Sequence, residues 1–392
     1  MHEMIRPIRE QLARMTHLSP DEFRMNDKLD GARADRLPFT QFHIELHSES
    51  SDEAGAGFTI TESTDESFYD IIRQKQQKEV NVTDWCPADI LEGMLRTFVG
   101  RVYVQSPDSL KELLKEPVTF FANHQTAAES LFFYQVLYAL SETSLIGIAA
   151  NQHLYSLLGL FLKHTRAFPG SNSNVFPLIF FDQSQPRLLR GLLEQLLSVA
   201  EQERRSILIH VEGTRRPHCR FPLQTLTTPV LDLAMTRGVP IIPIRFAGGL
   251  PSEDPGEVYC DFPYRYAKQD IYFGDPMYPS ELRELKRNEQ KETILRTIEA
   301  VGPDYMLEEP NEPNYLFQAE VDRWAKLQGI DPNQAVVYQA LTSVPEANLT
   351  PGMKLLLQKV EAGERLEGRT PLEQWLEFYW YLFVGLNQQH RR

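Results

Sequence analysis

The sequence has few cysteines and no long apolar run. Its three cysteines, Cys86, Cys219 and Cys260, are scattered along 392 residues. Thiols so few and so far apart suit neither a disulfide framework nor a thiolate metal cage, and they predict a reducing, cytosolic compartment. The best candidate for a membrane segment, residues 154–162, is far shorter than the ~18 apolar residues that a spanning helix needs. We therefore expect no helix that crosses a membrane.

Basic residues are also in short supply. The chain has 40 lysines and arginines against 54 aspartates and glutamates, which gives a formal net charge of −14 at pH 7. This balance repels the phosphate backbone of nucleic acids, so DNA and RNA are not expected as partners. Residues 1–15 mix acids and bases without the apolar block of a secretory signal, and export is not expected either.

Several motifs of well-known catalytic sites are missing. The sequence contains no G-x-S-x-G, no G-x-G-x-x-G and no Walker pattern, which argues against a common serine hydrolase, a dinucleotide-binding fold and a P-loop enzyme. His210, His218 and Cys219 lie close together in sequence, but no second group of metal-binding residues accompanies them. We expect neither a metal site nor a resident cofactor.

The composition that is present is that of an ordinary globular protein. Hydrophobic residues make up 42% and charged residues 24%, and the length predicts two or three domains. We divide the chain into a helical and acidic region at 1–85, an α/β domain at 86–308 and a helical region at 309–392. Within the first region, residues 37–72 contain eight acidic side chains and no lysine or arginine, a pattern typical of a solvated, mobile segment.

The middle region alternates short apolar runs with longer helical patterns, which indicates strands covered by helices. Gly238 is typical of a helix end, and the proline inside the run 241–246 favours a sheet edge or a bulge. The predicted strands are 118–122, 145–149, 175–181, 207–211, 241–246 and 271–273, and the predicted helices are 129–140, 152–162, 187–201 and 229–237.

The last predicted helix, residues 371–386, carries a dense aromatic load that includes Trp375, Phe378, Tyr379 and Trp380. Packing on the rest of the protein is the first interpretation of such a helix. A membrane-surface or partner-docking face is the alternative, although few basic residues precede the terminal arginines.

The most informative stretch is VTFFANHQTAAESLFFYQVL, residues 118–137. An apolar strand leads into a turn that contains Asn123 and His124. This turn lies at the C-terminal edge of the sheet, where α/β proteins place ligands. Glu129 can meet His124 only if the histidine precedes the helix and the glutamate lies in its first turn. A structural alternative is that Thr126 and Glu129 form a capping box, in which both side chains bind free amides at the helix start.

Two later segments add to this pattern. The predicted strand 207–211 runs into Glu212-Gly-Thr-Arg215, where glycine permits a tight turn and the arginine presents a fork suited to phosphate or carboxylate. The apolar strand Val239-Pro-Ile-Ile-Pro243 then follows. Each segment is a weak signal when taken alone.

In this order and spacing, these segments resemble the glycerolipid acyltransferase family, that is, the glycerol-phosphate and lysophosphatidate acyltransferases. The resemblance rests on the histidine with an acidic residue five positions on, a second block near 176–183, the Glu-Gly-Thr-Arg turn and the proline-bearing strand. It implies a mixed, mostly parallel sheet flanked by helices, with helical extensions at both ends of the chain. The helical N-terminal region resembles the soluble plastid-type glycerol-3-phosphate acyltransferases.

The resemblance implies direct acyl transfer from a thioester to a hydroxyl group. His124 is then the general base, and Glu129 fixes its tautomer and stabilises the imidazolium. Glu212, Gly213, Thr214 and Arg215 are implied to bind the acceptor. Asn123, Gln183 and Arg187 are possible supporting residues.

The sequence departs from the family pattern at three positions, and the departure at Gln183 bears on the acceptor. Glu129 stands where the family usually has aspartate, Gln183 where it commonly has an arginine that holds the acceptor phosphate, and Val211 where it usually has proline. Arg187 or Arg190 could compensate from the following helix. The acceptor is therefore expected to be glycerol-3-phosphate or a lysophospholipid, with a non-phosphorylated alcohol or a carrier-bound intermediate as the alternative.

The donor and partners are also matters of expectation. The segment between positions 163 and 245 contains eleven basic and six acidic residues, so it has a positive net charge within an acidic chain. An acidic acyl carrier protein or the phosphates of acyl-coenzyme A would bind to such a basic surface. We expect a cytoplasmic enzyme of phospholipid biosynthesis, with a peripheral position at a membrane as the alternative. A non-catalytic acyl-carrier-binding protein of the same fold is the remaining alternative.

Overall fold

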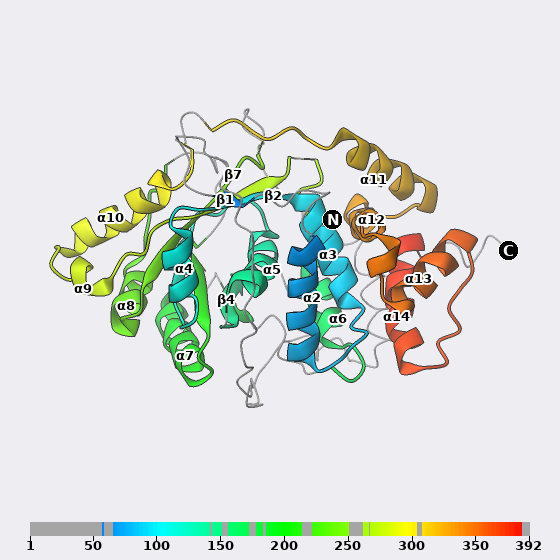
Figure 1. Cartoon of the computed structure of the whole chain (residues 1–392), viewed down its shortest axis with the longest axis horizontal. Coiled ribbons are helices and arrows are strands. Elements are labelled where there is room, and N and C mark those ends of the chain that lie inside the picture. The colour runs from blue at the N-terminus through cyan, green and yellow to red at the C-terminus, as the bar shows by residue number, and fades with distance from the viewer. Residues whose placement is uncertain are drawn as a thin grey trace.

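An eight-stranded sheet runs through the computed structural model, in the order β1-β2-β8-β7-β3-β6-β4-β5 (Figure 1). The structure describes residues 57–58, 66–141, 143–150, 156–171, 178–182, 186–213, 222–250, 262–265, 267–303 and 308–385. The pairs β1–β2 and β7–β8 are antiparallel, and the other neighbours are parallel. The expected mixed, mostly parallel sheet is confirmed.

Most predicted strands appear close to their expected positions. In sequence order the strands are β1 (Gly57–Phe58), β2 (Val99–Val104), β3 (Thr119–Ala122), β4 (Leu145–Ala150), β5 (Leu178–Phe181), β6 (Ser206–His210), β7 (Ile241–Ala247) and β8 (Gln269–Phe273). Strand β2 was not predicted. The first residues of the predicted strand 175–181 lie outside the described residues.

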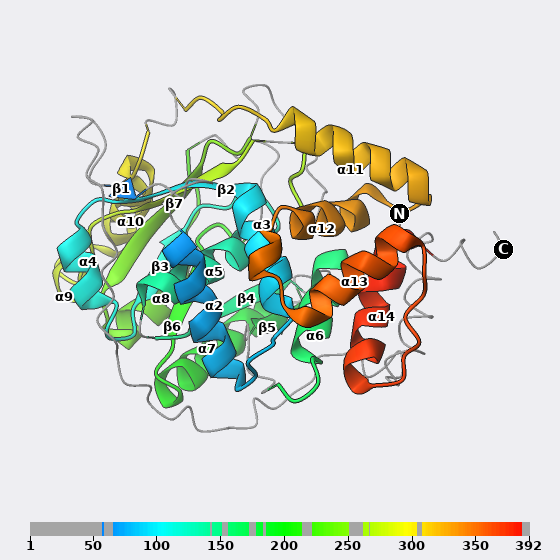
Figure 2. The ribbon, with the colours of Figure 1, turned by 45° about the vertical axis from the view of Figure 1, so that its right-hand side comes forward.

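Helices cover both faces of the sheet (Figures 1 and 2). The buried residues on the two faces form two hydrophobic layers. Adjacent strand residues point to opposite faces. Phe120 accordingly packs in the first layer, with α2, α3, α5 and α6, whereas Phe121 packs in the second, with α7, α8 and α10. The helices of the α/β region are α2 (Glu66–Val80), α3 (Pro87–Phe98), α4 (Pro107–Leu113), α5 (Glu129–Leu140), α6 (Leu157–Arg166), α7 (Leu189–Gln202), α8 (Thr228–Arg237), α9 (Pro279–Leu282) and α10 (Arg287–Ala300).

The C-terminal helices pack beside α3 and α6 (Figure 2), and their buried residues belong to the first hydrophobic layer instead of forming a core of their own. They are α11 (Tyr315–Gln328), α12 (Pro332–Thr342), α13 (Pro351–Ala362) and α14 (Pro371–Val384). The aromatic residues of α14 are buried. His164 of α6 and Trp375 of α14 exchange hydrogen bonds with each other's backbone carbonyl at 2.9 and 2.8 Å. The first interpretation of this helix, packing on its own protein, is confirmed.

Pro243 corrects one expectation. The proline was predicted to mark a sheet edge or a bulge, but β7 lies inside the sheet, between β8 and β3. The Pro243 carbonyl accepts a hydrogen bond from the amide of Gly274, just past the end of β8. In an antiparallel pair a residue's N–H and C=O point to the same neighbour. The missing N–H therefore faces the point where β8 ends, and no ladder hydrogen bond inside β8 is lost.

Gly238 ends α8 in the left-handed conformation, with φ at 69°. We expect Gly238→Ala to lower the free energy of unfolding by about 1 kcal/mol, because a Cβ disfavours this backbone region. Gly191 is the matched control, since it is an exposed helical glycine with open space around its Cβ position. Gly191→Ala should raise the free energy of unfolding by about 0.5–1 kcal/mol. Urea denaturation measures both, and two shifts of the same sign would contradict this account.

Candidate active site

The candidate site lies where two parallel strands end side by side. In the register of β3 and β6, Ala122 stands opposite His210. His124 follows β3 by two residues, and α5 begins at Glu129. Because parallel strands present their carboxyl ends at one edge of a sheet, this arrangement places both histidines at the same edge.

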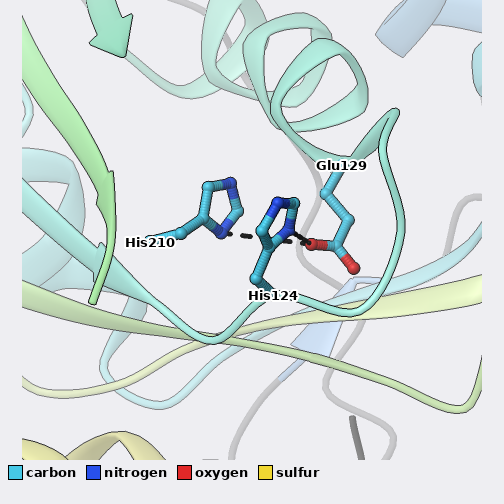
Figure 3. A group of neighbouring side chains, drawn as sticks. All are labelled: His124, Glu129 and His210. Atoms are coloured by element: carbon cyan, nitrogen blue, oxygen red, sulfur yellow. Dashed lines mark hydrogen bonds and ion pairs between the residues drawn. The ribbon is translucent and has the colours of Figure 1, made fainter. Parts of the chain in front are cut away.

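His124 and Glu129 are in direct contact (Figure 3). The distance from Nδ1 of His124 to Oε2 of Glu129 is 2.9 Å. The histidine side chain is 15% exposed, whereas the glutamate is fully buried. The pair therefore combines a buried carboxylate with a ring that solvent can reach.

Hydrogen-bond donors surround the Glu129 carboxylate. The backbone amides of Gln125 and Thr126 donate to it at 2.8 and 2.6 Å, and the side-chain amide of Gln269 donates at 2.8 Å. This geometry is not the capping box that was considered as an alternative. The helix begins at Glu129 itself, and in the described part of the chain the buried hydroxyl of Thr126 has no hydrogen-bond partner.

Burial raises the pKa of Glu129 to about 7, and the nearby His210 together with the hydrogen bonds from Gln269, Thr126 and Gln125 acts against this rise. Burial lowers the pKa of His210 to about 3, and the charge of the adjacent His124 acts in the same direction. His210 is therefore neutral near pH 7, and the carboxylate of Glu129 changes its charge within the physiological range.

Asn123 joins the turn to the neighbouring strand. Its side-chain amide donates to the carbonyl of Phe246 in β7 at 2.8 Å, and its side-chain oxygen accepts from the amide of Phe246 at 2.7 Å. Two hydrogen bonds to one residue fix the backbone immediately before His124. Asn123 is thus a structural anchor of the turn.

The structure describes part of the expected acceptor site. Gly213 has a φ of 71° and its amide donates to the carbonyl of His210, so it closes the tight turn that the sequence predicts. Glu212 accepts a hydrogen bond from the amide of Gln224 at 3.0 Å. Arg187 is exposed in a short 3-10 turn, Pro186–Leu188. Gln183, Thr214 and Arg215 lie outside the described residues.

Two further residues at the site were not predicted. Gln269 is the first residue of β8, and His210 is the last residue of β6. The position of His210 at a predicted strand end was a usable signal, because parallel strand ends meet at one edge. Gln269 gave no such signal, since β8 was predicted to begin only at residue 271.

His124, Glu129 and His210 offer atoms within 4.8 Å of one another, a spacing that a metal ion could bridge. The hydrogen bonds favour a different interpretation. Nδ1 of His210 lies 2.6 Å from the carbonyl oxygen of Asn123 and must donate to it. The Glu129 oxygens already accept from two backbone amides and one side-chain amide. These three residues therefore resemble a histidine–carboxylate pair with a supporting ring.

Comparisons with known proteins found a family model and a solved structure that this chain resembles. The family model described as Acyltransferase matches residues 101–247, which run from β2 to the end of β7. A lysophosphatidate acyltransferase from Thermotoga maritima, PlsC, is a similar solved structure, with 17% identity and a TM-score of 0.35. The match covers 54% of this chain and 77% of that one. No curated protein sequence matches the chain.

Among the described residues, no helix is both long and apolar enough to cross a bilayer. The family model identifies residues 101–247 as an acyltransferase domain, which supports an acyltransferase enzyme.

Proposed function

We propose that the protein transfers a fatty acyl group from a thioester to a hydroxyl group, with His124 as the general base. One observation carries this proposal: Nδ1 of a partly exposed histidine is held by a buried carboxylate at 2.9 Å. A carboxylate in that position keeps the hydrogen on Nδ1, so Nε2 is the nitrogen that can accept a proton.

The proposed reaction needs no covalent enzyme intermediate. Nε2 of His124 takes the proton of the acceptor hydroxyl while the oxygen attacks the thioester carbonyl. The tetrahedral intermediate collapses, the C–S bond breaks, and the imidazolium returns the proton to the leaving thiolate. Glu129 stabilises the imidazolium throughout. The products are an ester and a free thiol, and no cofactor beyond the acyl thioester is required.

We propose a glycerolipid acceptor, either glycerol-3-phosphate or a lysophospholipid. Glu212, Gly213, Thr214 and Arg215 would bind its head group, with Arg187 and Gln183 as supporting residues. The support is that Gly213 makes a tight turn directly after β6, only three residues beyond His210. Arg215, two residues further along the sequence, would provide a fork for a phosphate.

The donor would be acyl carrier protein or acyl-coenzyme A, and the enzyme would act in the cytoplasm or at a membrane surface. The net positive charge of the segment between 163 and 245 supports an anionic donor only in part, because some of its arginines are not available for binding. Arg205, Arg237 and Arg245 are engaged inside the fold. The exposed members, which include Arg187, would have to contact the donor phosphates or an acidic carrier.

A product analysis tests the proposal. The protein is incubated with a defined acyl-coenzyme A or acyl carrier protein and a panel of alcohols, and the products are identified by mass spectrometry. We expect an ester of glycerol-3-phosphate or of a lysophospholipid. Glycerol-3-phosphate should also compete with other acceptors.

Two other results would redirect the assignment. An ester formed only with non-phosphorylated alcohols, without competition by glycerol-3-phosphate, would favour the acceptor class that Gln183 suggests. Binding of the acyl carrier without any thiol release would favour the non-catalytic alternative.

A further inference from the structure

His210 takes no part in the proposed reaction, but its ring lies against the ring of His124, the proposed general base. The His124 and His210 rings are stacked, with centroids 4.0 Å apart and planes inclined by 23° (Figure 3). Nδ1 of His210 is 4.0 Å from the Glu129 oxygen that accepts from His124. A single face of the His124 ring is therefore covered by a second imidazole.

Both nitrogens of His210 have partners. Nδ1 donates to the carbonyl of Asn123 at 2.6 Å, and Nε2 lies 2.9 Å from the hydroxyl of Ser130 in α5. A carbonyl can only accept, so the proton stays on Nδ1 and Nε2 accepts from the serine. With this hydrogen-bond pattern, His210 has no nitrogen to offer a substrate proton.

The bond to Asn123 matters because that carbonyl belongs to the residue immediately before His124. The Asn123 side chain is already fixed to Phe246 of β7. His210 fixes the backbone of the same residue from β6, and the strand register brings it there, since Ala122 stands opposite His210. The turn that carries His124 is thus held from both neighbouring strands.

We infer that His210 is a positioning residue, which sets the orientation of His124 by stacking on its ring and by holding the Asn123 carbonyl. This inference rests on the proposed function of His124. Orientation of this kind acts on the chemical step, because a displaced base loses alignment with the acceptor hydroxyl while substrate binding is unaffected.

Three variants separate the two contacts. His210→Phe keeps an aromatic ring for stacking but removes the hydrogen bonds. His210→Asn keeps a short amide donor for the Asn123 carbonyl but removes the ring, and His210→Ala removes both. We expect kcat to fall about tenfold in each of the first two and about 10²-fold in the third, with KM changed less than about threefold.

His164 provides the matched control. It is also a buried histidine that is stacked on aromatic rings and bonded to a backbone carbonyl, but it joins α6 to α14. His164→Phe should lower the melting temperature and leave kcat of the folded protein unchanged. Equal kcat losses in His164→Phe and His210→Phe would show that His210 has only a general packing role, and would overturn the inference.

Two further outcomes overturn it as well. If all three His210 variants transfer acyl groups at the wild-type rate, the stack does not orient the base. If His210→Phe is as inactive as His124→Ala, His210 acts on the substrate directly. A readout independent of activity is nitrogen NMR of histidine-labelled protein, in which His210 should carry its proton on Nδ1 at neutral pH.

This design keeps the two proposals distinguishable. Absence of acyl transfer by the wild-type protein contradicts the proposed function, and the NMR experiment still tests whether His210 is locked as described. A wild-type protein that is active, and that loses activity in His124→Ala but not in His210→Ala, contradicts the positioning role alone.

Discussion

Replacing His124 with alanine is expected to slow thiol release from an acyl thioester by about 10³-fold, within the range that removal of a general base produces. The reason is local. His124 is the partly exposed ring at the end of β3, and the buried carboxylate of Glu129 polarises it from one side. Without the ring, the acceptor hydroxyl must attack as a neutral alcohol. A thiol-reactive dye reports the rate in the presence and absence of acceptor.

The His124→Ala experiment needs proof that the variant is folded and binds its donor. We expect the variant to stay folded, because His124 is at the carboxyl end of β3 and outside the two hydrophobic layers. Binding of the acyl donor should also persist. Equal rates of thiol release in the variant and the wild type would exclude His124 as the base.

Glu129→Gln is expected to lower kcat by about 10²-fold, since the carboxylate both fixes the tautomer of His124 and stabilises the imidazolium. Two backbone amides and the Gln269 amide donate to this carboxylate. A side-chain amide at position 129 would direct its own N–H groups towards at least one of these donors. Glu129→Asp should also lose activity, because these donors are placed for the longer side chain.

The pH profile of the wild type gives a second test of Glu129. Burial raises the pKa of this carboxyl to about 7. Below that pH the carboxyl is neutral and cannot stabilise a charged imidazole, so kcat/KM should be low and should rise as the pH passes about 7.

Glu92 is the matched control for these variants. It is a buried glutamate of α3 that pairs with Arg73 and Arg96. Glu92→Gln should destabilise the protein and leave the pH midpoint unchanged. A wild-type rate that is flat between about pH 5 and pH 8 would contradict the role of Glu129.

Local patterns predicted the elements next to the site well. The apolar run before Asn123 is β3, and the predicted helix 129–140 has the same bounds as α5. Both follow from periodicity within a short window, so no distant contact had to be known. Strand β2 was missed because its apolar residues alternate with Gly100, Arg101 and Tyr103, which is a weaker pattern than a continuous apolar run.

The distant members of the site could not be predicted in the same way. Gln269 reaches Glu129 only because β8 runs antiparallel to β7, and its first residue therefore lies at the edge where β3 ends. Strand order decides such contacts, and the sequence pattern carries little information about it. The same limit explains the wrong prediction for Pro243. This residue of β7 lies beside the point where the neighbouring strand β8 ends, and β7 is not at an edge of the sheet.

The place of β8 in the sheet limits how far the chain can be shortened. The segment that matches the acyltransferase family ends at residue 247, but β8, at Gln269–Phe273, is the strand that joins β2 to β7. A fragment stopped at residue 247 would detach β2 and expose unsatisfied backbone groups along two strands, which invites pairing between molecules. Expression of the family-matched segment by itself would thus yield aggregates, and a workable truncation must extend beyond residue 273.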